Sequence, residues 1–147
     1  MTFSLSFRPR TTESNYVKVG KHPTAGNVCD SFVGMINRGA TGQDLNLSGF
    51  VGKDGCYTDD TVVHEFIHAW GFTHEQNRPD RNSFVTIKSA NIKDGKEKNF
   101  DIKTDFKTYG VQYNGLSVMH YSGKAFAKNK EKPTIVSKVQ PNSYSKL

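Results

Sequence analysis

The stretch "HEFIHAWGFTHEQNRPDR", residues 64–81, holds three of the chain's five histidines. His64 and His68 are four residues apart, so on a helix both imidazoles lie on the same face and can reach a single ion. Glu65 would then lie close enough to that ion to bind its water without acting as a ligand. Because a short HExxH pattern also arises by chance on polar helix faces, two interpretations stay open at this point: a metal site, or ordinary polar residues.

The residues around this motif predict a helix. Residues 61–72, "TVVHEFIHAWGF", contain no proline, and the preceding Asp59 and Asp60 are good N-cap residues. Gly71 is expected to end the helix, because glycine adopts a left-handed conformation without a Cβ clash. The apolar residues recur at helical spacing and are expected to form one stripe: Val63, Phe66, Ile67 and Trp70.

The continuation of the motif favours a metal site. After Gly71 the chain can leave the helix sharply, so His74 can return as a third nitrogen ligand. Three protein nitrogens and an open position describe a catalytic zinc site, with one Zn²⁺ per chain. Because zinc lowers the pKa of a bound water toward about 7, Glu65 can act as general base and then protonate a leaving amine. The predicted reaction is peptide hydrolysis.

The rest of the chain reads as one mixed domain over residues 1–147. No internal repeat or proline-rich linker divides it. Residues in short apolar or β-branched runs predict strands at 3–7, where Phe3, Leu5 and Phe7 alternate with polar residues, at 15–19, around Leu45 and Leu47, at 83–87 and at 133–139.

Composition excludes several classes of protein. Apolar residues make up 35% of the chain, and no apolar run approaches the roughly 18 residues that cross a bilayer. The net charge of +6 comes from scattered lysines, and clusters at 93–98 and 128–132 are interleaved with acidic residues, which is typical of solvated loops. No nucleic-acid-binding signature accompanies them. We therefore expect neither a membrane nor a nucleic-acid partner.

Cysteine usage leaves two alternatives. Cys29 and Cys56 are the only cysteines, and neither belongs to a CxxC pair. Thiolate metal binding is therefore not expected, and the residues form either a disulfide, which implies an oxidising compartment, or two free thiols.

Two long motifs together resemble the astacin family of zinc endopeptidases. The pattern HExxHxxGxxH is the zinc motif of the metzincins, which also carry a methionine turn. Here the motif continues as "HEQNRPDR", and "SVMHY" at 117–121 matches the turn. The likeness runs from about Phe7 to at least Tyr121. It implies an α+β fold with a mixed twisted sheet, an active-site helix carrying HExxH, and a Met-turn.

The resemblance also implies roles for individual residues. His64, His68 and His74 would bind zinc, and Glu65 would be the catalytic base. Met119 would form an apolar floor, and Tyr121 would be an extra zinc ligand that can leave the metal and stabilise the oxyanion. Taken singly, Met119 and Tyr121 would instead be assigned to core packing.

Further implications concern the first half of the chain. Cys29 and Cys56 match the internal disulfide of the family, with 49–55 as an apparent insertion. Residues 43–47, "QDLNL", would be the edge strand to which an extended polypeptide substrate adds. A glycosylation sequon begins at Asn46, but a glycan would crowd the cleft, which argues against its use. By resemblance we expect a secreted protein, and we expect a monomer.

The ends of the chain depart from the family pattern. The family's second disulfide would align with about Ser4, and the chain stops at Leu147 before the C-terminal helix, so we expect truncation at both ends. The buried amino terminus that partners the carboxylate of Glu75 is also missing. Glu75 is therefore expected to be solvated, to be compensated by Arg78 or Arg81, or to belong to a less ordered site.

Two functional interpretations follow. The intact Glu65 favours a secreted astacin-like metalloendopeptidase. The missing ends favour an inactive remnant that binds zinc or a protein partner. A third interpretation, a basic nucleic-acid-binding module, predicts strongly salt-dependent binding of DNA or RNA.

Overall fold

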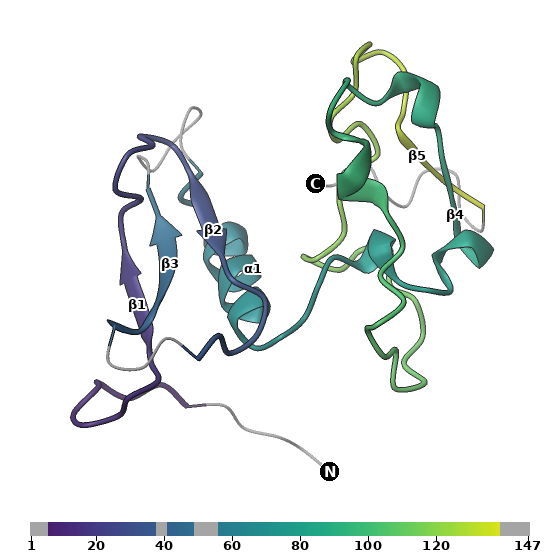
Figure 1. Cartoon of the computed structure of the whole chain (residues 1–147). Coiled ribbons are helices and arrows are strands. Elements are labelled where there is room, and N and C mark those ends of the chain that lie inside the picture. Colours follow the sequence, from purple (N-terminus) through teal and green to yellow (C-terminus); the bar gives the residue numbers. More distant parts are fainter. Residues whose placement is uncertain (1–5, 38–40, 49–55, 139–147) are drawn as a thin grey trace. The chain divides into compact units, whose positions relative to one another are not determined.

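The computed structural model describes residues 6–37, 41–48 and 56–138 (Figure 1). The chain forms two compact units, Met1–Phe72 and Thr73–Leu147, which are described separately. Helix and sheet both occur, so the predicted α+β class is confirmed. A single functional domain over residues 1–147 stays a prediction.

The first unit contains a mixed three-stranded sheet. Its strands are β1 (Val17–Gly20), β2 (Cys29–Ser31) and β3 (Gln43–Leu47), in the order β1-β3-β2 (Figure 1). Strand β3 runs parallel to β1 and antiparallel to β2. Predictions at 15–19 and around Leu45 are confirmed, whereas β2 was not predicted. Phe3 and Leu5 lie outside the described residues, and Phe7 is not in a strand.

The assignment of residues 43–47 as the edge strand was wrong. Strand β3 lies between β1 and β2, and its Leu45 is 0% exposed. Alternation of apolar and polar residues indicates a strand but not its neighbours, because pairing partners are fixed by distant segments. The edges of this sheet are β1 and β2.

Helix α1 (Asp59–Ala69) confirms the predicted helix but starts differently. Thr58 is the N-cap, since its hydroxyl oxygen accepts a hydrogen bond from the Thr61 amide at 3.1 Å. Asp59 and Asp60 lie in the first turn instead, where their negative charges interact favourably with the positive end of the helix dipole.

The helix ends at glycine, as predicted. Gly71 has φ +99°, its amide donates to the His68 carbonyl at 2.8 Å, and the Phe72 amide donates to the Ile67 carbonyl at 3.2 Å. This pair of bonds is the Schellman motif. The Gly34 amide also donates to the His68 carbonyl at 2.8 Å, which ties the segment after β2 to the end of the helix.

The predicted apolar stripe is only partly buried. Val63 and Trp70 are 50% and 41% exposed, while the buried positions of α1 are Glu65 and His68. Phe66 and Trp70 line a groove of about 620 Å³, in which Phe7 packs on the Phe66 ring at 4.9 Å between centroids. The helix therefore turns polar residues, not its most apolar ones, to the interior.

Cys29 and Cys56 form a disulfide with a Cα separation of 5.8 Å. This result decides between the two alternatives left by the sequence. The bond joins β2 to the segment that enters α1, so it restrains the start of the helix against the sheet. The apparent insertion at 49–55 lies outside the described residues.

The second unit is built mainly from turns. Its strands, β4 (Val85–Ile87) and β5 (Ile135–Ser137), pair antiparallel and confirm the two predicted strands. Its 3₁₀ turns are η2 (Glu75–Asn77), η3 (Arg81–Ser83), η4 (Ser89–Asn91) and η5 (Glu97–Phe100). One cluster of buried side chains forms its core: Val85, Ile92, Phe100, Tyr113 and Ile135.

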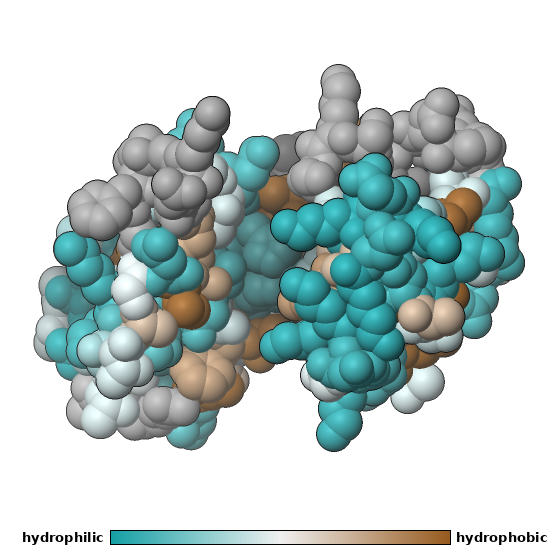
Figure 2. Space-filling model, turned by 90° about the horizontal axis from the view of Figure 1, so that it is seen from above, coloured by the Kyte–Doolittle hydropathy of each residue, from teal (hydrophilic) through white to brown (hydrophobic). Residues whose placement is uncertain are grey.

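The lysine-rich clusters of the second unit are exposed. Residues 93–98 and 128–132 all face solvent, as predicted. This unit, on the right in Figure 2, turns a largely hydrophilic face to the viewer. Among the described residues, no helix is both long and apolar enough to cross a membrane.

Candidate metal centre

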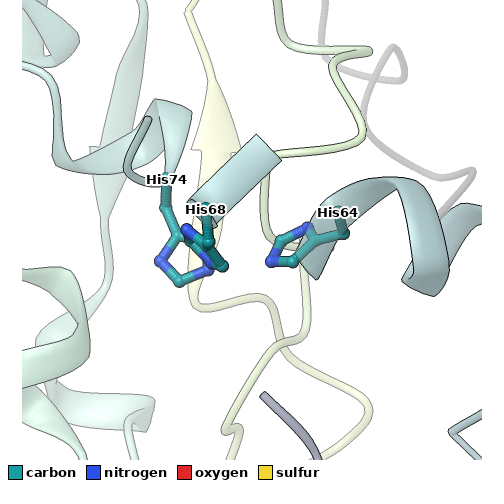
Figure 3. A group of neighbouring side chains, drawn as sticks. All are labelled: His64, His68 and His74. Carbon is teal, nitrogen blue, oxygen red and sulfur yellow. The ribbon is translucent and has the colours of Figure 1, made fainter. Parts of the chain in front are cut away.

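Three histidine side chains gather at the end of helix α1. Donor nitrogens of His64, His68 and His74 lie within 4.8 Å of one another (Figure 3). The first two rings lie one turn apart on α1, with centroids 4.6 Å apart, and the chain that leaves the helix at Gly71 brings the third. All three belong to one run of the chain, 64–74, so local folding assembles the predicted cluster.

The tautomer of His68 suits a metal ligand. Its Nδ1 lies 2.8 Å from the Phe72 carbonyl oxygen, which can only accept, so Nδ1 carries the proton and Nε2 is the unprotonated nitrogen, the one that can bind a metal. Burial lowers the pKa of His68, and the neighbouring His64 adds to this, although the Phe72 bond opposes both. The ring is therefore held neutral, which is the form that binds metal.

The donor set fits zinc. Three imidazoles within reach of one ion match the ligands and the open position of a catalytic zinc site, and soft or carboxylate donors are not needed. The structure thus confirms that the predicted histidines can hold one metal ion.

Glu65 lies on α1 next to His64 and is 6% exposed. Burial raises the pKa of this carboxyl to about 7 in the metal-free protein, and the negative charge of Asp30 contributes to the same shift. A carboxyl with a pKa near neutrality can both take and return a proton.

The methionine turn is formed by residues 117–120. The His120 amide donates to the Ser117 carbonyl at 2.9 Å, and the Met119 amide donates to the Ser117 hydroxyl at 3.1 Å. Met119 is 5% exposed, so it is buried as an apolar floor would be.

Tyr121 follows this turn and lies beside the third histidine. The ring centroids of His74 and Tyr121 are 4.4 Å apart, and the Glu75 amide donates to the Met119 carbonyl at 3.0 Å. Burial raises the pKa of the Tyr121 phenol. The segment that carries His74 and the segment that carries Met119 and Tyr121 are therefore neighbours within the second unit.

Glu75 has a partner, and it is Arg78. The guanidinium of Arg78 lies 3.0 Å from the Glu75 carboxylate, and the Asn114 amide donates to the same oxygen at 2.7 Å. Both side chains are largely buried, at 16% exposure for Glu75 and 12% for Arg78. Arg81 donates instead to the carbonyls of Gln76 and Phe100. Of the outcomes foreseen for Glu75, compensation by Arg78 is the one observed.

Sequence reasoning missed several buried polar residues around this centre. Gln76 is 0% exposed, and its Oε1 accepts from the Tyr121 amide at 3.0 Å. Asn77 donates to the carbonyls of Asn99 and Asp101 at 3.0 and 2.7 Å. The only signal available was the run "QN" inside a long motif, and it gives no hint of burial.

Asn46 is buried at 9% exposure, and its Nδ2 donates to the Asp30 carboxylate at 2.8 Å. A glycan would replace one of the two Nδ2 hydrogens and would have to leave from this buried position beside Asp30. The expectation that the sequon is unused stays a prediction, and this geometry supports it.

Comparisons with known proteins cover nearly the whole chain. The profile of the family described as Astacin, a peptidase family, matches residues 2–146. Meprin A subunit beta of Rattus norvegicus is 41% identical over 137 residues, which are 92% of this chain and 18% of meprin. Astacin-like metalloprotease toxin 1 of Loxosceles intermedia is 37% identical over 138 residues, or 93% of this chain and 48% of the toxin. The chain thus spans less than half of the length of these relatives.

A solved structure agrees with these sequence matches. High choriolytic enzyme 1, a hatching enzyme zinc-protease from Oryzias latipes, superimposes with a TM-score of 0.78 at 32% identity, over 92% of this chain and 62% of that protein. The metzincin-like fold predicted from the motifs is therefore confirmed. By its family profile, its relatives and its fold, this chain belongs to the astacin family.

Proposed function

We propose that this chain carries out zinc-dependent endoproteolysis of polypeptides. The observation that carries the proposal is the cluster of His64, His68 and His74, whose donor nitrogens lie within 4.8 Å of one another beside the helix that also bears Glu65. The similarity to the hatching enzyme zinc-protease of Oryzias latipes and to the metalloprotease toxin of Loxosceles intermedia supports it.

The three histidines would hold one Zn²⁺, with Tyr121 as an additional ligand. When bound, zinc supplies a Lewis acid that makes water acidic enough to lose a proton near neutral pH. His68 enters this role already oriented, because its Nδ1–H is fixed on the Phe72 carbonyl.

Glu65 would move the proton. Its carboxylate accepts a proton from the attacking water and then returns it to the nitrogen of the leaving amine. Burial favours the protonated form of Glu65, so the proton can be held between the two steps. No other carboxylate of α1 is buried.

Tyr121 would stabilise the developing charge. Because burial raises its pKa, the phenol can keep its proton and donate a hydrogen bond to the carbonyl oxygen as that oxygen becomes negative. Met119, which is buried two residues before Tyr121, would form the apolar floor of the site.

The disulfide bears on the compartment in which the protein acts. The Cys29–Cys56 disulfide belongs to an oxidising compartment, which supports secretion. We expect the protein to act as a monomer.

The proposal is tested by cleavage of an unstructured protein, such as casein, by the full chain refolded with zinc under oxidising conditions. Turnover should stop on chelation and return with zinc. His74→Ala should bind zinc weakly and lose turnover. His22→Gln should keep both, because His22 lies outside the cluster and its Nδ1 accepts from the neighbouring Thr24 and Ala25 amides. Equal zinc affinity in His74→Ala and wild type would contradict the assigned ligand set.

A further inference from the structure

The backbone of Tyr121 is held on both sides by buried side chains. Its amide donates to Gln76 Oε1 at 3.0 Å, and its carbonyl oxygen lies 2.6 Å from Nδ1 of His120. Gln76 is 0% exposed and His120 is 2% exposed. The two side chains that hold the Tyr121 backbone are therefore themselves shielded from bulk water.

The orientation of the Gln76 amide is fixed by its other contacts. Asn77 uses its Nδ2 to donate to the carbonyls of Asn99 and Asp101, so its Oδ1 can only accept. Gln76 Nε2 donates to that Oδ1 at 3.2 Å. Its Oε1 must therefore point the other way, toward the Tyr121 amide.

The ring of His120 is fixed by the same reasoning. The Tyr121 carbonyl only accepts, so Nδ1 of His120 carries the proton. Its Nε2 then accepts from the hydroxyl of Tyr113, at 2.6 Å. The Tyr113 ring stacks on Phe84 with centroids 4.7 Å apart, which anchors this side of the chain of bonds in the core.

Gln76 also lies two residues after the third histidine of the metal cluster. The Glu75 amide bonds the Met119 carbonyl, and the next link along the same two segments is the Gln76 to Tyr121 bond. These two bonds set the spacing between the segment that carries His74 and the segment that carries Tyr121, whose rings lie 4.4 Å apart.

We propose that Gln76 is a positioning residue that holds the phenol of Tyr121 at the metal centre through the Tyr121 backbone. This inference rests on the proposed function, in which Tyr121 binds zinc and assists the reaction. Gln76 itself touches neither the metal nor the substrate in this account. Its effect on catalysis must therefore vanish when the phenol is absent.

The variant Gln76→Met keeps the length of the side chain and removes the acceptor. The Tyr121 amide, which is part-buried, then loses its acceptor, so the segment shifts or water enters to replace the bond. We expect kcat to fall roughly 10- to 100-fold, in the range seen for residues that orient metal ligands, with KM little changed. Zinc affinity should also be lower in Gln76→Met than in wild type.

The decisive experiment is a double-mutant cycle with Tyr121→Phe, measured on the full chain by kcat, KM and zinc affinity. In the Tyr121→Phe background, Gln76→Met should change kcat and zinc affinity by less than about 3-fold, because the phenol it positions is gone. Independent, multiplying effects of the two substitutions would overturn the inference and leave Gln76 a purely structural residue.

A matched control is Asn91→Leu, which removes a side-chain amide that ties two other segments of the same unit. Asn91 Nδ2 donates to the carbonyls of Asn129 and Lys132, at 3.1 and 2.8 Å. This variant should lose thermal stability but keep kcat and zinc affinity. A fall in kcat as large as that of Gln76→Met would show that any loss of stability in this unit lowers activity, and would overturn the inference.

Hydrogen exchange of the Tyr121 amide in the metal-free protein separates this inference from the proposed function. Gln76→Met should speed exchange at Tyr121 at least about 10-fold relative to wild type, whether or not the chain cleaves peptides. Unchanged exchange would overturn the inference while leaving the protease proposal intact. A different result is also informative: wild type shows no turnover, Gln76→Met exchanges faster at Tyr121, and the double-mutant cycle shows coupling in zinc affinity. This result would reject proteolysis and retain the positioning role of Gln76.

Discussion

The Nδ1 of His68 and the carbonyl oxygen of Phe72 lie 2.8 Å apart, so the turn that ends helix α1 also orients one of the three clustered histidines. Phe72 is placed there by the Schellman motif, in which its amide bonds the Ile67 carbonyl across Gly71. The conformation of Gly71 therefore affects the orientation of the His68 ring through two hydrogen bonds, one made by the Phe72 amide and one made by the Phe72 carbonyl.

Gly71→Ala should weaken zinc binding as well as stability. A Cβ at Gly71 meets no atom closer than 3.7 Å, so the effect comes from its φ of +99°, which an L-residue adopts at a cost of about 1 kcal/mol or more. We expect a lower Tm and roughly 10-fold weaker zinc affinity by chelator competition. Gly95→Ala is the control, because Gly95 has φ +77° and open space around it but belongs to no segment that carries one of the three histidines. Gly95→Ala should lower Tm and leave zinc affinity unchanged. An equal loss of zinc affinity in the Gly71 and Gly95 variants would contradict this account.

Replacing Glu65 with its neutral isostere should stabilise the metal-free protein in a pH-dependent way. The folded pKa of about 7 lies above the ordinary value of 4.5, so ionising Glu65 opposes folding. The penalty is absent below about pH 4.5, grows as pH rises to 7, and is then on the order of 3 kcal/mol. Glu65→Gln should therefore raise Tm at pH 8 but not at pH 4.5. Glu131→Gln, at an exposed position, should change Tm at neither pH.

The pair of Glu75 and Arg78 should be strongly coupled. Arg78→Leu removes the guanidinium from a carboxylate that is only 16% exposed, and should lower the free energy of unfolding by about 2 kcal/mol. In a Glu75→Gln background, Arg78→Leu should lower the free energy of unfolding by less, because no carboxylate is then left without its partner. Additive losses in urea unfolding of the four proteins would show that Arg78 stabilises the fold through its other contacts, with Asp80, the Val111 carbonyl and the Tyr113 ring, and not through Glu75.

Loss of the disulfide should destabilise the first unit. Cys29→Ser combined with Cys56→Ser removes a link across 27 residues, for which the chain-entropy model gives roughly 3 kcal/mol. Because the bond joins β2 to the start of α1, we expect the helix to unfold at a lower temperature in this variant. Thermal unfolding monitored by circular dichroism measures this change. An unchanged Tm would mean that packing alone holds this segment.

The cluster of three histidines and the helix could be predicted because their geometry is local. His64 and His68 lie on the same helix face because of the helical repeat alone. Gly71 indicates the turn that ends the helix and brings His74 back toward them. The role of Gln76 could not be predicted, since its partner Tyr121 lies 45 residues further along the chain. A polar residue in the sequence does not reveal that it is fully buried.

The errors in the first unit have the same origin. Residues 43–47 alternate as a strand should, but their position between β1 and β2 depends on two separate pairings. Val63 and Trp70 follow helical spacing, yet both are substantially exposed, and Trp70 lines an open groove. Periodicity indicates an element and its faces; what covers each face depends on the tertiary fold.

The most direct test of the central claim compares wild type with Glu65→Ala, both as full chains with zinc content measured on the same samples used for turnover. Both proteins should hold one zinc ion per chain, and cleavage of casein should fall at least about 1,000-fold in Glu65→Ala, as expected when a group that moves the proton is lost. A folded, zinc-loaded wild type without turnover, or a Glu65→Ala variant as active as wild type, would contradict the account. The first of these results would identify the chain as a zinc-binding relative without protease activity.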